Sequence, residues 1–563
     1  MVRTEGIEPS RELPRQNLNL VRLPIPPRSR VERDGYLPVL AASRRQGLPN
    51  LPSRTLAASK MRTLQRWAFR AVHGVVGLQV SQPPTNARRP RATAPVDVRP
   101  QAGYTPDTLP MIEAIVFRGV RAVDAGARSA SPSASAVTAA LEDAAAEVDV
   151  VVERGRITRL GRDAGADFAG PSRDRSGRVR VVERRGAWLL PGLIDIHAHL
   201  REPGAEGKED VASGLLAAAA GGFVDVCCMP NTRPVNDSRV VTEMLVAKGR
   251  AHGGARLHPI GAITMGQAGE QLSEMADMRA AGAVAVSDDG RCVTNSHVMR
   301  RALEYASTFD LPVIQHAEDH ALTEGAQMHE GSVSTRLGLR GWPRVAEDVI
   351  VARDLLLAEY VGARYHVAHV STAGSVRLLR EAKSRGVPVT AEVTPHHLLL
   401  THEALLGYDT ACKVNPPLRE EHDVEALRAG LSDGTIDCVA TDHAPHGTLD
   451  KNVELAEAAP GMIGLELCLP LLLGLVHAGQ LPLGRLVEAM TTAPARVVGI
   501  DVPRLREGAR ADLVLVDPTE RWTIDPARLR SKSRNTPFLG RTVAGRVVMT
   551  LCEGRIIFEH AEA

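Results

Sequence analysis

The stretch PGLIDIHAHLR, residues 191–201, gives the strongest indication of both the fold and the chemistry of this chain. Its apolar run over 192–199 is typical of a buried strand, and it ends in two histidines separated by one residue. Side chains two positions apart on a strand face the same way, so His197 and His199 point together. Two imidazoles on one side of a strand suit a shared zinc ion. Taken alone, the pair is equally consistent with two structural histidines.

Seven more strand-like runs follow this one, and Ala- and Leu-rich stretches of helical length lie between most of them. About eight β/α units in one region predict an α/β fold, a closed TIM-type (β/α)8 barrel over 189–500. In such barrels the active site lies at the C-terminal ends of the strands. The runs are 192–199, 223–229, 257–263, 283–287, 313–316, 365–370, 387–393 and 438–440.

Histidine and aspartate recur where these strands meet their loops. The fourth run is followed by Asp288 and Asp289, the fifth ends at His316, the sixth contains His369, and the eighth is followed by Asp442. Together with the first-strand histidines, these residues predict a metal centre at one rim of the barrel. Imidazole and carboxylate ligands without cysteine are typical of a catalytic zinc or a similar divalent ion.

Shorter strand-like runs flank the barrel region on both sides. We expect 111–188, with an Ala/Ser-rich insertion at 125–146, and 501–563 to form one small β-sandwich from both ends. Residues 1–110 show no useful periodicity and are rich in Pro and Arg, which is typical of a segment that cannot bury enough apolar area to fold. They are expected to be a disordered or mis-annotated extension, with Met111 favoured as the true start.

Composition narrows the class of protein. With 44% hydrophobic and 24% charged residues, the chain fits a soluble globular protein. Residues 1–110 carry 17 Arg and one Lys against seven acidic residues, so the remainder is acidic although the net charge is +2. An acidic main body argues against nucleic acid as a partner. The seven cysteines form no CxxC pair, and neither a signal peptide nor a membrane span is visible, so we expect a cytoplasmic enzyme.

Several motifs together carry a resemblance to a known family. The signature at 191–197 resembles that of the amidohydrolase superfamily. With LREPG at 200–204, MPNT at 229–232, NPPLR at 415–419 and DHAPH at 442–446, the chain from about Met111 onward resembles the type I dihydroorotases of bacteria. The resemblance implies reversible zinc-dependent hydrolysis of the cyclic amide of L-dihydroorotate to N-carbamoyl-L-aspartate, in de novo pyrimidine (UMP) biosynthesis.

The resemblance also implies a role for each metal ligand. His197, His199 and Asp442 would hold one zinc, His316 and His369 a second, and Asp289 would bridge the two, in place of the carbamylated lysine of many relatives. Asp288 stays the alternative bridge. Two zinc ions per subunit are favoured over one. Zinc lowers the pKa of bound water to about 7, and Asp442 would act as general base and acid.

Substrate contacts are expected beside the metals. Arg201 lies two residues past His199 and can grip a carboxylate through two parallel hydrogen bonds. The resemblance adds Asn231 and His446 as contacts to that carboxylate, and Asn415 and the backbone at Gly461 as contacts to the ring amide. For His396 and His397 a structural role is favoured.

Two other functions compete with this interpretation. The first is another cyclic amidohydrolase, such as a hydantoinase, dihydropyrimidinase or allantoinase. The second is a non-catalytic dihydroorotase-like subunit of an aspartate carbamoyltransferase complex. A homodimer and an association with that transferase are compatible with catalysis, whereas neither nucleic acid nor a membrane is expected as a partner.

Overall fold

A computed structural model describes residues 112–124, 147–168 and 178–561 of the chain. The predicted extension over 1–110 and the predicted insertion over 125–146 lie outside the described residues. The described part contains a barrel and a strand-rich region, and both belong to one compact unit.

Eight strands form the barrel in the order in which they follow one another along the chain, each parallel to its neighbours. All eight coincide with predicted runs, so the prediction of a (β/α)8 barrel is confirmed. The strands are β6 (Leu193–Ala198), β7 (Phe223–Cys228), β8 (Arg256–Gly261), β9 (Ala285–Ser287), β10 (Val313–Gln315), β13 (Tyr365–Val367), β14 (Val389–Val393) and β15 (Cys438–Val439).

The barrel closes between its first and last strands. The backbone N–H of His199 donates to the carbonyl of His443 over 2.8 Å, and Ala198 and His443 form a parallel bridge. Asp195 of β6 accepts hydrogen bonds from the backbone N–H of Thr441 at 2.9 Å and from its hydroxyl at 2.5 Å. This seam brings the loop after β6 beside the loop after β15.

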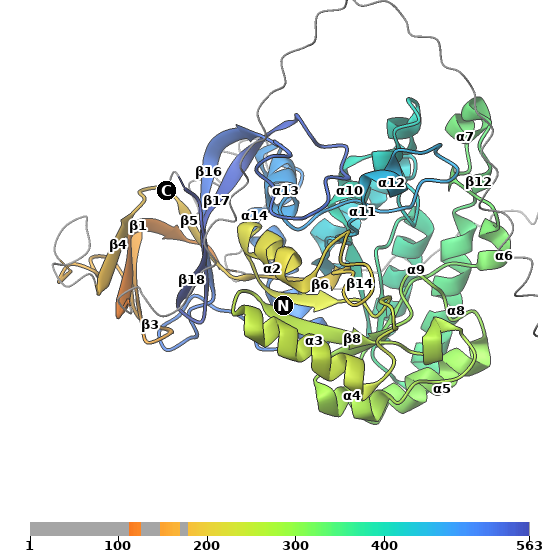
Figure 1. The fold of residues 1–563 in the computed structure, drawn as a ribbon, viewed down its shortest axis with the longest axis horizontal. Coiled ribbons are helices and arrows are strands. Elements are labelled where there is room, and N and C mark those ends of the chain that lie inside the picture. Colours follow the sequence, from red (N-terminus) through yellow and green to blue (C-terminus); the bar gives the residue numbers. More distant parts are fainter. Residues whose placement is uncertain (1–111, 125–146, 169–177, 562–563) are drawn as a thin grey trace, which may run out of the picture. The chain divides into compact units, whose positions relative to one another are not determined.

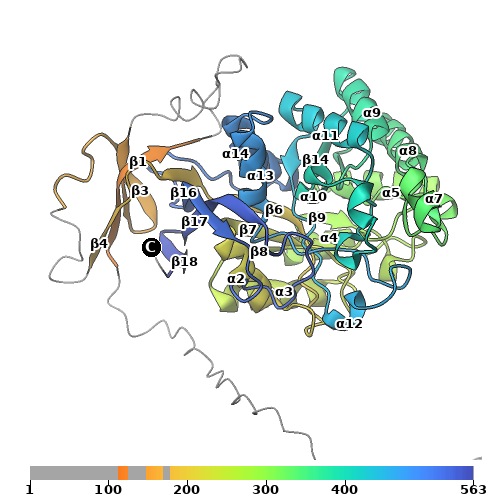
Figure 2. The ribbon, with the colours of Figure 1, turned by 90° about the horizontal axis from the view of Figure 1, so that it is seen from above.

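Helices surround the strands, as Figure 2 shows. Their ends follow ordinary capping rules: Asp210 accepts from the backbone N–H of Ser213 at the start of α2, and Gly253 and Gly362 end α3 and α8 with positive φ. The longer helices are α2 (Val211–Ala220), α3 (Arg239–His252), α4 (Met275–Ala281), α5 (Ser296–Ser307), α8 (Val345–Val361), α9 (Ala373–Ser384), α11 (Glu421–Asp433), α13 (Cys468–His477), α14 (Leu483–Met490) and α15 (Thr492–Val498). Short elements in the loops are α6 (His320–Thr323), α7 (Ser332–Leu337), α10 (Pro395–Leu399), α12 (Thr448–Lys451), β11 (Met328–His329), β12 (Gly341–Trp342) and the 3-10 turns Met265–Gln267, His402–Leu405 and Thr410–Cys412.

Strands from both ends of the described chain pair in the second region, where the orange β1–β5 and the blue β16–β18 lie side by side in Figure 1. The order is β18-β17-β16-β5-β1-β2-β3, with β4 beside β1. β1 bends at its irregularity between Phe117 and Val120, so that its first half pairs with β4 and its second half with β5. The strands are β1 (Ala114–Ala122), β2 (Val148–Glu153), β3 (Arg156–Gly161), β4 (Val179–Glu183), β5 (Trp188–Pro191), β16 (Leu513–Thr523), β17 (Thr542–Cys552) and β18 (Arg555–Glu559).

β5 extends the sandwich beyond the boundary expected at residue 188. It pairs with β16 through Leu189 and Leu190, and all four of its residues are buried. A strand covered on both faces shows no alternation of polar and apolar residues, so periodicity does not identify it.

The sandwich packs on the barrel through one face of β16. Leu513 and Leu515 belong to the core of the sandwich, whereas Val514 and Val516 belong to the barrel core. Arg256 of β8 crosses the same junction, since it donates two hydrogen bonds to Asp225 of β7 and two to Asp512 beside β16. The sandwich is therefore joined to the barrel by apolar packing and by buried charge.

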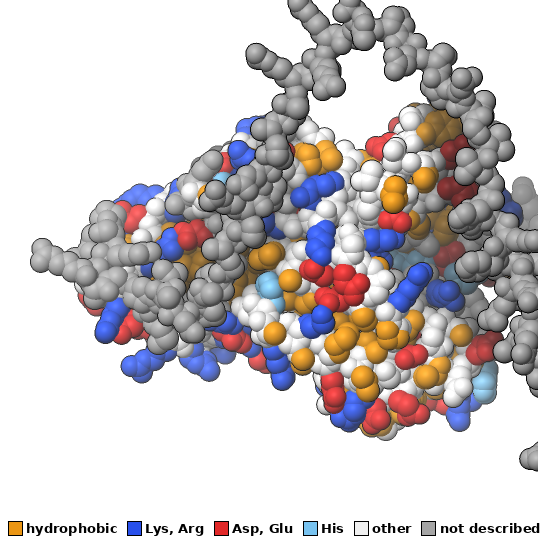
Figure 3. Space-filling model, in the orientation of Figure 1, with side chains coloured by type: hydrophobic (Ala, Val, Ile, Leu, Met, Phe, Trp, Pro, Cys, Tyr) orange, Lys and Arg blue, Asp and Glu red, His pale blue; other side chains and the backbone are white. Residues whose placement is uncertain are grey.

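The apolar helix α13 is largely buried. Among the described helices, none is both long and apolar enough to cross a bilayer. On the face drawn in Figure 3, side chains of both charges are interspersed, and hydrophobic side chains gather over the region of α3 and α4.

Candidate metal centre and substrate cavity

Four histidines at the rim of the barrel surround one carboxylate, that of Asp289. Its Oδ1 lies 3.3 Å from His197 Nε2, 3.5 Å from His316 Nδ1 and 3.3 Å from His369 Nε2, and its Oδ2 lies 3.4 Å from His199 Nε2. These residues come from the ends of four strands, β6, β9, β10 and β13. A carboxylate with imidazoles at both of its oxygens has the arrangement of a bridging ligand.

Asp442 joins this cluster from the far side of the barrel seam. Its Oδ1 lies 3.1 Å from His199 Nε2 and 3.7 Å from His197 Nε2. Asp442 and His369 both have positive φ, 45° and 29°. Non-glycine residues rarely adopt this backbone, which is maintained where the surrounding structure fixes it and is frequent at functional sites.

The structure separates the two aspartates that follow β9. Asp288 turns away from the histidines, and its carboxylate accepts from the backbone N–H groups of Ile263 at 2.7 Å and Thr264 at 3.0 Å and from the Thr264 hydroxyl. It is Asp289 that the structure brings to the histidines. Asp288 therefore holds the loop after β8 in place through these hydrogen bonds.

Charges within the cluster shift its proton affinities strongly. Burial raises the pKa of the Asp289 carboxyl, but the neighbouring imidazoles, first that of His197, outweigh burial and hold it well below its usual range. Burial lowers the pKa of His197, but Asp289 and Glu392 outweigh it and raise this pKa well above its ordinary value. The buried carboxylates therefore demand positive charge, which either protons or a metal can supply.

The donor atoms fit a divalent metal. Ligand atoms of His197, Asp289 and His369 lie within 4.8 Å of one another, and so do those of His197, His199 and Asp442. His197 Nε2 is buried and has no hydrogen-bond partner in the described part of the chain. A buried nitrogen without a partner is costly unless something binds it. Nitrogen and oxygen donors without sulfur are the ligand set of catalytic zinc and related ions.

Two glutamates orient the histidines from behind. Glu392 of β14 accepts from His197 Nδ1 at 2.6 Å, from His366 Nε2 at 3.2 Å and from the backbone N–H of His369 at 3.2 Å. Glu318 lies 3.0 Å from His316 Nε2. Such contacts fix the ring orientation of metal ligands. The sequence prediction did not include either residue, although an acid inside the mostly apolar strand β14 was a usable signal.

A cavity of about 190 Å³ opens beside the metal centre. Its lining includes all five residues that the sequence analysis proposed for substrate contacts: Arg201, Asn231, Asn415, His446 and Gly461. His199, Asp289, His316, His369 and Asp442 line it too. The structure therefore places five of the six expected metal ligands and all the expected substrate contacts around one space, and the sixth ligand, His197, contacts Asp289 beside it.

Arg201 has a guanidinium at this cavity with no carboxylate in ion-pair contact among the described residues. Its Nε donates to the carbonyl of Pro445 over 3.1 Å, and its Nη2 lies 3.3 Å from His446 Nε2. Burial lowers the pKa of Arg201 to about 10, so it remains a cation at neutral pH. A buried cation with an open face is suited to an anionic ligand.

His446 is held neutral by its surroundings. Burial, followed by the nearby charges of Arg201 and Lys208, lowers the pKa of His446 to about 3. Lys208 Nζ lies 3.4 Å from its Nδ1, and its Nε2 lies 2.9 Å from the carbonyl of Pro460. Cationic donors thus approach both ring nitrogens, Lys208 at Nδ1 and Arg201 at Nε2, which disfavours a positive charge on the imidazole.

The two asparagines at the cavity have different partners. Asn231 Oδ1 lies 2.9 Å from His199 Nδ1, so it orients a candidate metal ligand besides lining the cavity. Asn415 donates from Nδ2 to Glu318 over 3.2 Å, whereas its buried Oδ1 has no partner in the described structure. That oxygen is available to accept a ligand N–H.

Gly461 and the neighbouring pair His396 and His397 are the remaining residues that the sequence analysis singled out. Gly461 has φ of 128°, and a Cβ there would lie 2.6 Å from Ala444 Cβ, so only glycine fits this approach. His397 contacts the Thr394 hydroxyl at 2.7 Å and the carbonyl of Pro416 at 3.0 Å. His396 is buried and its Nε2 has no partner among the described residues.

Comparisons with known proteins agree with this arrangement. A dihydroorotase of Anaeromyxobacter dehalogenans (strain 2CP-C) is 55% identical over 392 residues, which are 69% of this chain and 90% of that protein. The chain belongs to the dihydroorotase family. A family member from Pelobacter propionicus is 50% identical over 412 residues, 73% of this chain and 95% of its own. Residues 186–375 match the family described as Dihydro-orotase-like, and 350–558 match the Amidohydrolase family.

Solved structures show the same fold at lower identity. An L-hydantoinase (dihydropyrimidinase) from Arthrobacter aurescens has a TM-score of 0.67 at 24% identity and covers 79% of this chain and 96% of that one. A D-hydantoinase from Thermus sp. gives 0.65 at 23% identity, with 79% and 95% covered. The dihydroorotase family is thus represented here on an amidohydrolase barrel, and the chain is an enzyme of that type.

Proposed function

We propose that this enzyme is a zinc-dependent dihydroorotase that interconverts L-dihydroorotate and N-carbamoyl-L-aspartate in the cytoplasm, as a step of pyrimidine (UMP) biosynthesis. One juxtaposition carries the proposal. The guanidinium of Arg201, which has no carboxylate partner among the described residues, and the His/Asp cluster face the same cavity of about 190 Å³. A cyclic amide that carries a carboxylate can place its carboxylate on Arg201 and its amide at the His/Asp cluster. Family membership at 50–55% identity agrees with it.

Zinc is the favoured metal, and two ions per subunit are favoured over one. His197, His199 and Asp442 would hold one ion, His316 and His369 the other, with Asp289 between them. Bound zinc supplies a Lewis acid for the amide carbonyl and lowers the pKa of water.

Asp442 is positioned to move the proton. Burial raises its pKa, but the imidazoles, first that of His199, outweigh burial and hold the pKa well below its usual range, so Asp442 is a carboxylate at neutral pH. It accepts a proton from the water that attacks the ring carbonyl. It then donates this proton to the ring nitrogen as the C–N bond breaks. In the reverse direction it removes a proton from the ureido nitrogen.

The remaining cavity residues orient the ring. Arg201 grips the substrate carboxylate through two N–H groups, and His446 and Asn231 line the same cavity. The free Oδ1 of Asn415 accepts a ring N–H, and the backbone at Gly461 faces the ring amide. Orientation of this kind makes a large contribution to the rate of such reactions.

A second candidate function has a specific observation in its favour. Solved structures that resemble this chain include hydantoinases and dihydropyrimidinases. Their substrates as named carry no carboxylate that requires Arg201, so this alternative leaves the buried guanidinium unexplained. A non-catalytic subunit is disfavoured because all six candidate ligands converge.

Metal analysis coupled to an assay tests the proposal. The purified full chain should contain close to two zinc ions and should turn over dihydroorotate in both directions. Removal of the metal with a chelator should abolish turnover, and added zinc should restore it. Hydrolysis of hydantoin or allantoin with no turnover of dihydroorotate would favour the alternative.

The assembly of the enzyme is part of the same proposal. A homodimer and an association with an aspartate carbamoyltransferase are both compatible with an active barrel. Light scattering of the chain alone, and again with the transferase of the same organism, separates these states.

A further inference from the structure

A segment of the sandwich domain reaches over to the rim of the barrel. It lies in the connection between β16 and β17. At the base of this connection the backbone N–H of Ile524 donates to the carbonyl of Arg541, and the carbonyl of Ile524 accepts from the backbone N–H of Gly540. We call residues 529–536 of this connection the strap. Leu529 of the strap and Phe538 beyond it are buried in an apolar cluster with Met462 and Ile463 of the loop after β15.

Barrel groups hold the strap along its length. Glu466 accepts from the backbone N–H groups of Arg530 at 2.8 Å and Ser531 at 3.0 Å. The fully buried Glu209 accepts from the Ser531 hydroxyl and from the backbone N–H of Lys532 at 3.1 Å. The strap is therefore docked on the barrel through specific buried hydrogen bonds.

Glu209 also connects the strap to the loop that carries Asp442. It lies 3.4 Å from His443 Nε2, and His443 Nδ1 accepts from the backbone N–H of Gly464 at 3.1 Å. One buried carboxylate thus joins the loop after β6, the loop after β15 and the strap. Such a network rigidifies a site when every member is paired.

Asn535 is the strap residue that reaches the cavity walls. Its Oδ1 accepts from the backbone N–H of His446 at 3.0 Å, and its Nδ2 donates to the carbonyls of Ala444 at 2.9 Å and Gly461 at 3.1 Å. Its own carbonyl accepts from the backbone N–H of Ile463 at 3.0 Å. The buried side chain uses its donors and its acceptor on two different walls of the substrate cavity.

We propose that Asn535 is a positioning residue that fixes the spacing between His446 and Gly461, so that the strap of the sandwich domain sets the affinity of the barrel for its substrate. The inference rests on the proposed function, since it assigns Asn535 to the site that binds dihydroorotate. Asn535 touches neither the metal ligands nor the cavity space itself. Its loss should therefore change substrate binding more than the chemical step.

The test compares two substitutions in the strap. Asn535→Ala removes three hydrogen bonds to the cavity walls and should raise KM for dihydroorotate by roughly 10- to 100-fold, with kcat changed less than about threefold. Ser533→Ala is the matched control, because the Ser533 hydroxyl donates to the carbonyl of Lys208 over 2.7 Å and contacts no cavity wall. Its KM should stay within about twofold of the wild type. Zinc content should be unchanged in both.

A second variant guards against loss of folding. Asn535→Asp keeps the size and the acceptor for His446 but places a carboxylate oxygen against the two carbonyls, so KM should rise as well. The inference is overturned if a folded Asn535→Asp or Asn535→Ala enzyme keeps the wild-type KM, whether or not its kcat falls. A wild-type chain that does not turn over dihydroorotate instead contradicts the proposed function, and the inference falls with it.

Discussion

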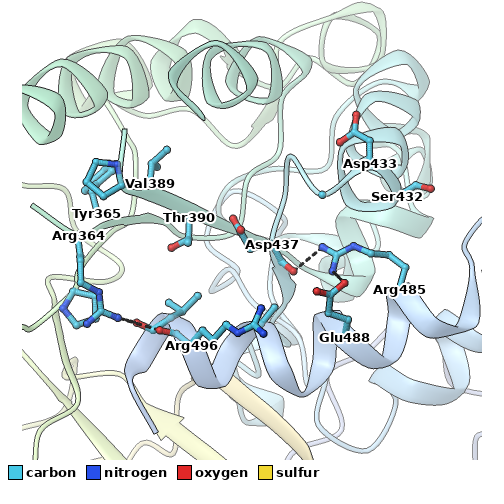
Figure 4. A pocket seen from close by; sticks show the side chains of 15 residues that line it. Arg364, Tyr365, Val389, Thr390, Ser432, Asp433, Asp437, Arg485, Glu488 and Arg496 are labelled. Atoms are coloured by element: carbon cyan, nitrogen blue, oxygen red, sulfur yellow. Dashed lines mark hydrogen bonds and ion pairs between the residues drawn. The ribbon is translucent and has the colours of Figure 1, made fainter. Parts of the chain in front are cut away.

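The barrel has a cavity at each end, and the larger one is not the candidate site. The cavity at the foot, where the strands begin, has a volume of about 480 Å³, against about 190 Å³ at the rim. Its lining is rich in charge, as Figure 4 shows, and includes Arg364, Arg485, Asp437 and Glu488. The two spaces differ in what their polar groups contact.

Polar groups at the foot are paired with the protein itself. Arg364 donates to Asp310 at 3.0 Å and to the carbonyls of Arg496 and Val497 near the end of α15. Arg485 donates to the carbonyls of Leu431, Ile436 and Asp437 and to Glu488. These arginines attach helices to the barrel.

A few polar atoms at the rim lack a hydrogen bond from the described protein. His197 Nε2 and Asn415 Oδ1 are buried and have no hydrogen-bond partner within the described residues, and Arg201 faces the cavity without a carboxylate. Buried polar groups are nearly always paired, so unpaired ones point to a missing ligand. Between these two spaces of the barrel, polar atoms without partners mark the candidate site, whereas volume does not.

The largest effect is expected from the rim carboxylate Asp442. Asp442→Ala removes both a candidate metal ligand and the proton carrier, and turnover should fall by at least about 1000-fold. Steady-state kinetics measure the loss of turnover, and metal analysis measures the loss of bound metal. Activity within tenfold of the wild type would break the distinction between rim and foot.

A matched pair of arginines gives a smaller effect. Arg201→Lys replaces a planar fork by a point charge and should raise KM for dihydroorotate by roughly 10- to 100-fold, with a smaller change in kcat. Arg364→Lys at the foot should leave KM unchanged and lower the melting temperature by about 2–4 °C. Equal effects of the two variants on KM would contradict the comparison.

The smallest effect concerns acid stability and Asp225 at the foot. Burial raises its pKa, but hydrogen bonds from His258 and Arg256 outweigh burial and hold the pKa at about 2, below an unfolded value of about 3.9. The stability that this provides is present above pH 4 and is lost as the pH falls toward 2, up to roughly 2 kcal/mol.

Asp225→Asn removes this titration. The free energy of unfolding should be lower in the variant at pH 6, and its difference from the wild type should narrow between pH 5 and pH 3. Urea unfolding at several pH values measures it. A difference that stays constant over this range would show that Asp225 does not hold a lowered pKa.

The fold could be predicted from the sequence because each barrel strand is a short apolar run that ends in a polar loop. Periodicity did not locate β5, which is buried on both faces. Strand β16 also continues to Thr523, past residues that ordinarily end a strand. Asp517, Pro518 and Thr519 resemble a turn, and β16 accommodates them through an irregularity between Asp517 and Arg521.

The candidate site could be predicted where its residues lie at strand ends. Each proposed metal ligand and substrate contact lies at the one rim. Supporting residues could not be found in this way, because their roles depend on approaches between distant segments. Glu392 contacts His197 across 195 positions, and Asn535 contacts His446 across 89.

The closure between β6 and β15 has a consequence for assembly of the enzyme. His199 and Asp442 stand on opposite sides of that closure, yet they are 3.1 Å apart and belong to the same candidate ligand set. An ion bound by both residues would connect the first and the last strands of the barrel. A chain whose barrel has not closed would present only part of this ligand set. Metal uptake would then report that folding is complete, and loss of metal would loosen the barrel where its two ends join.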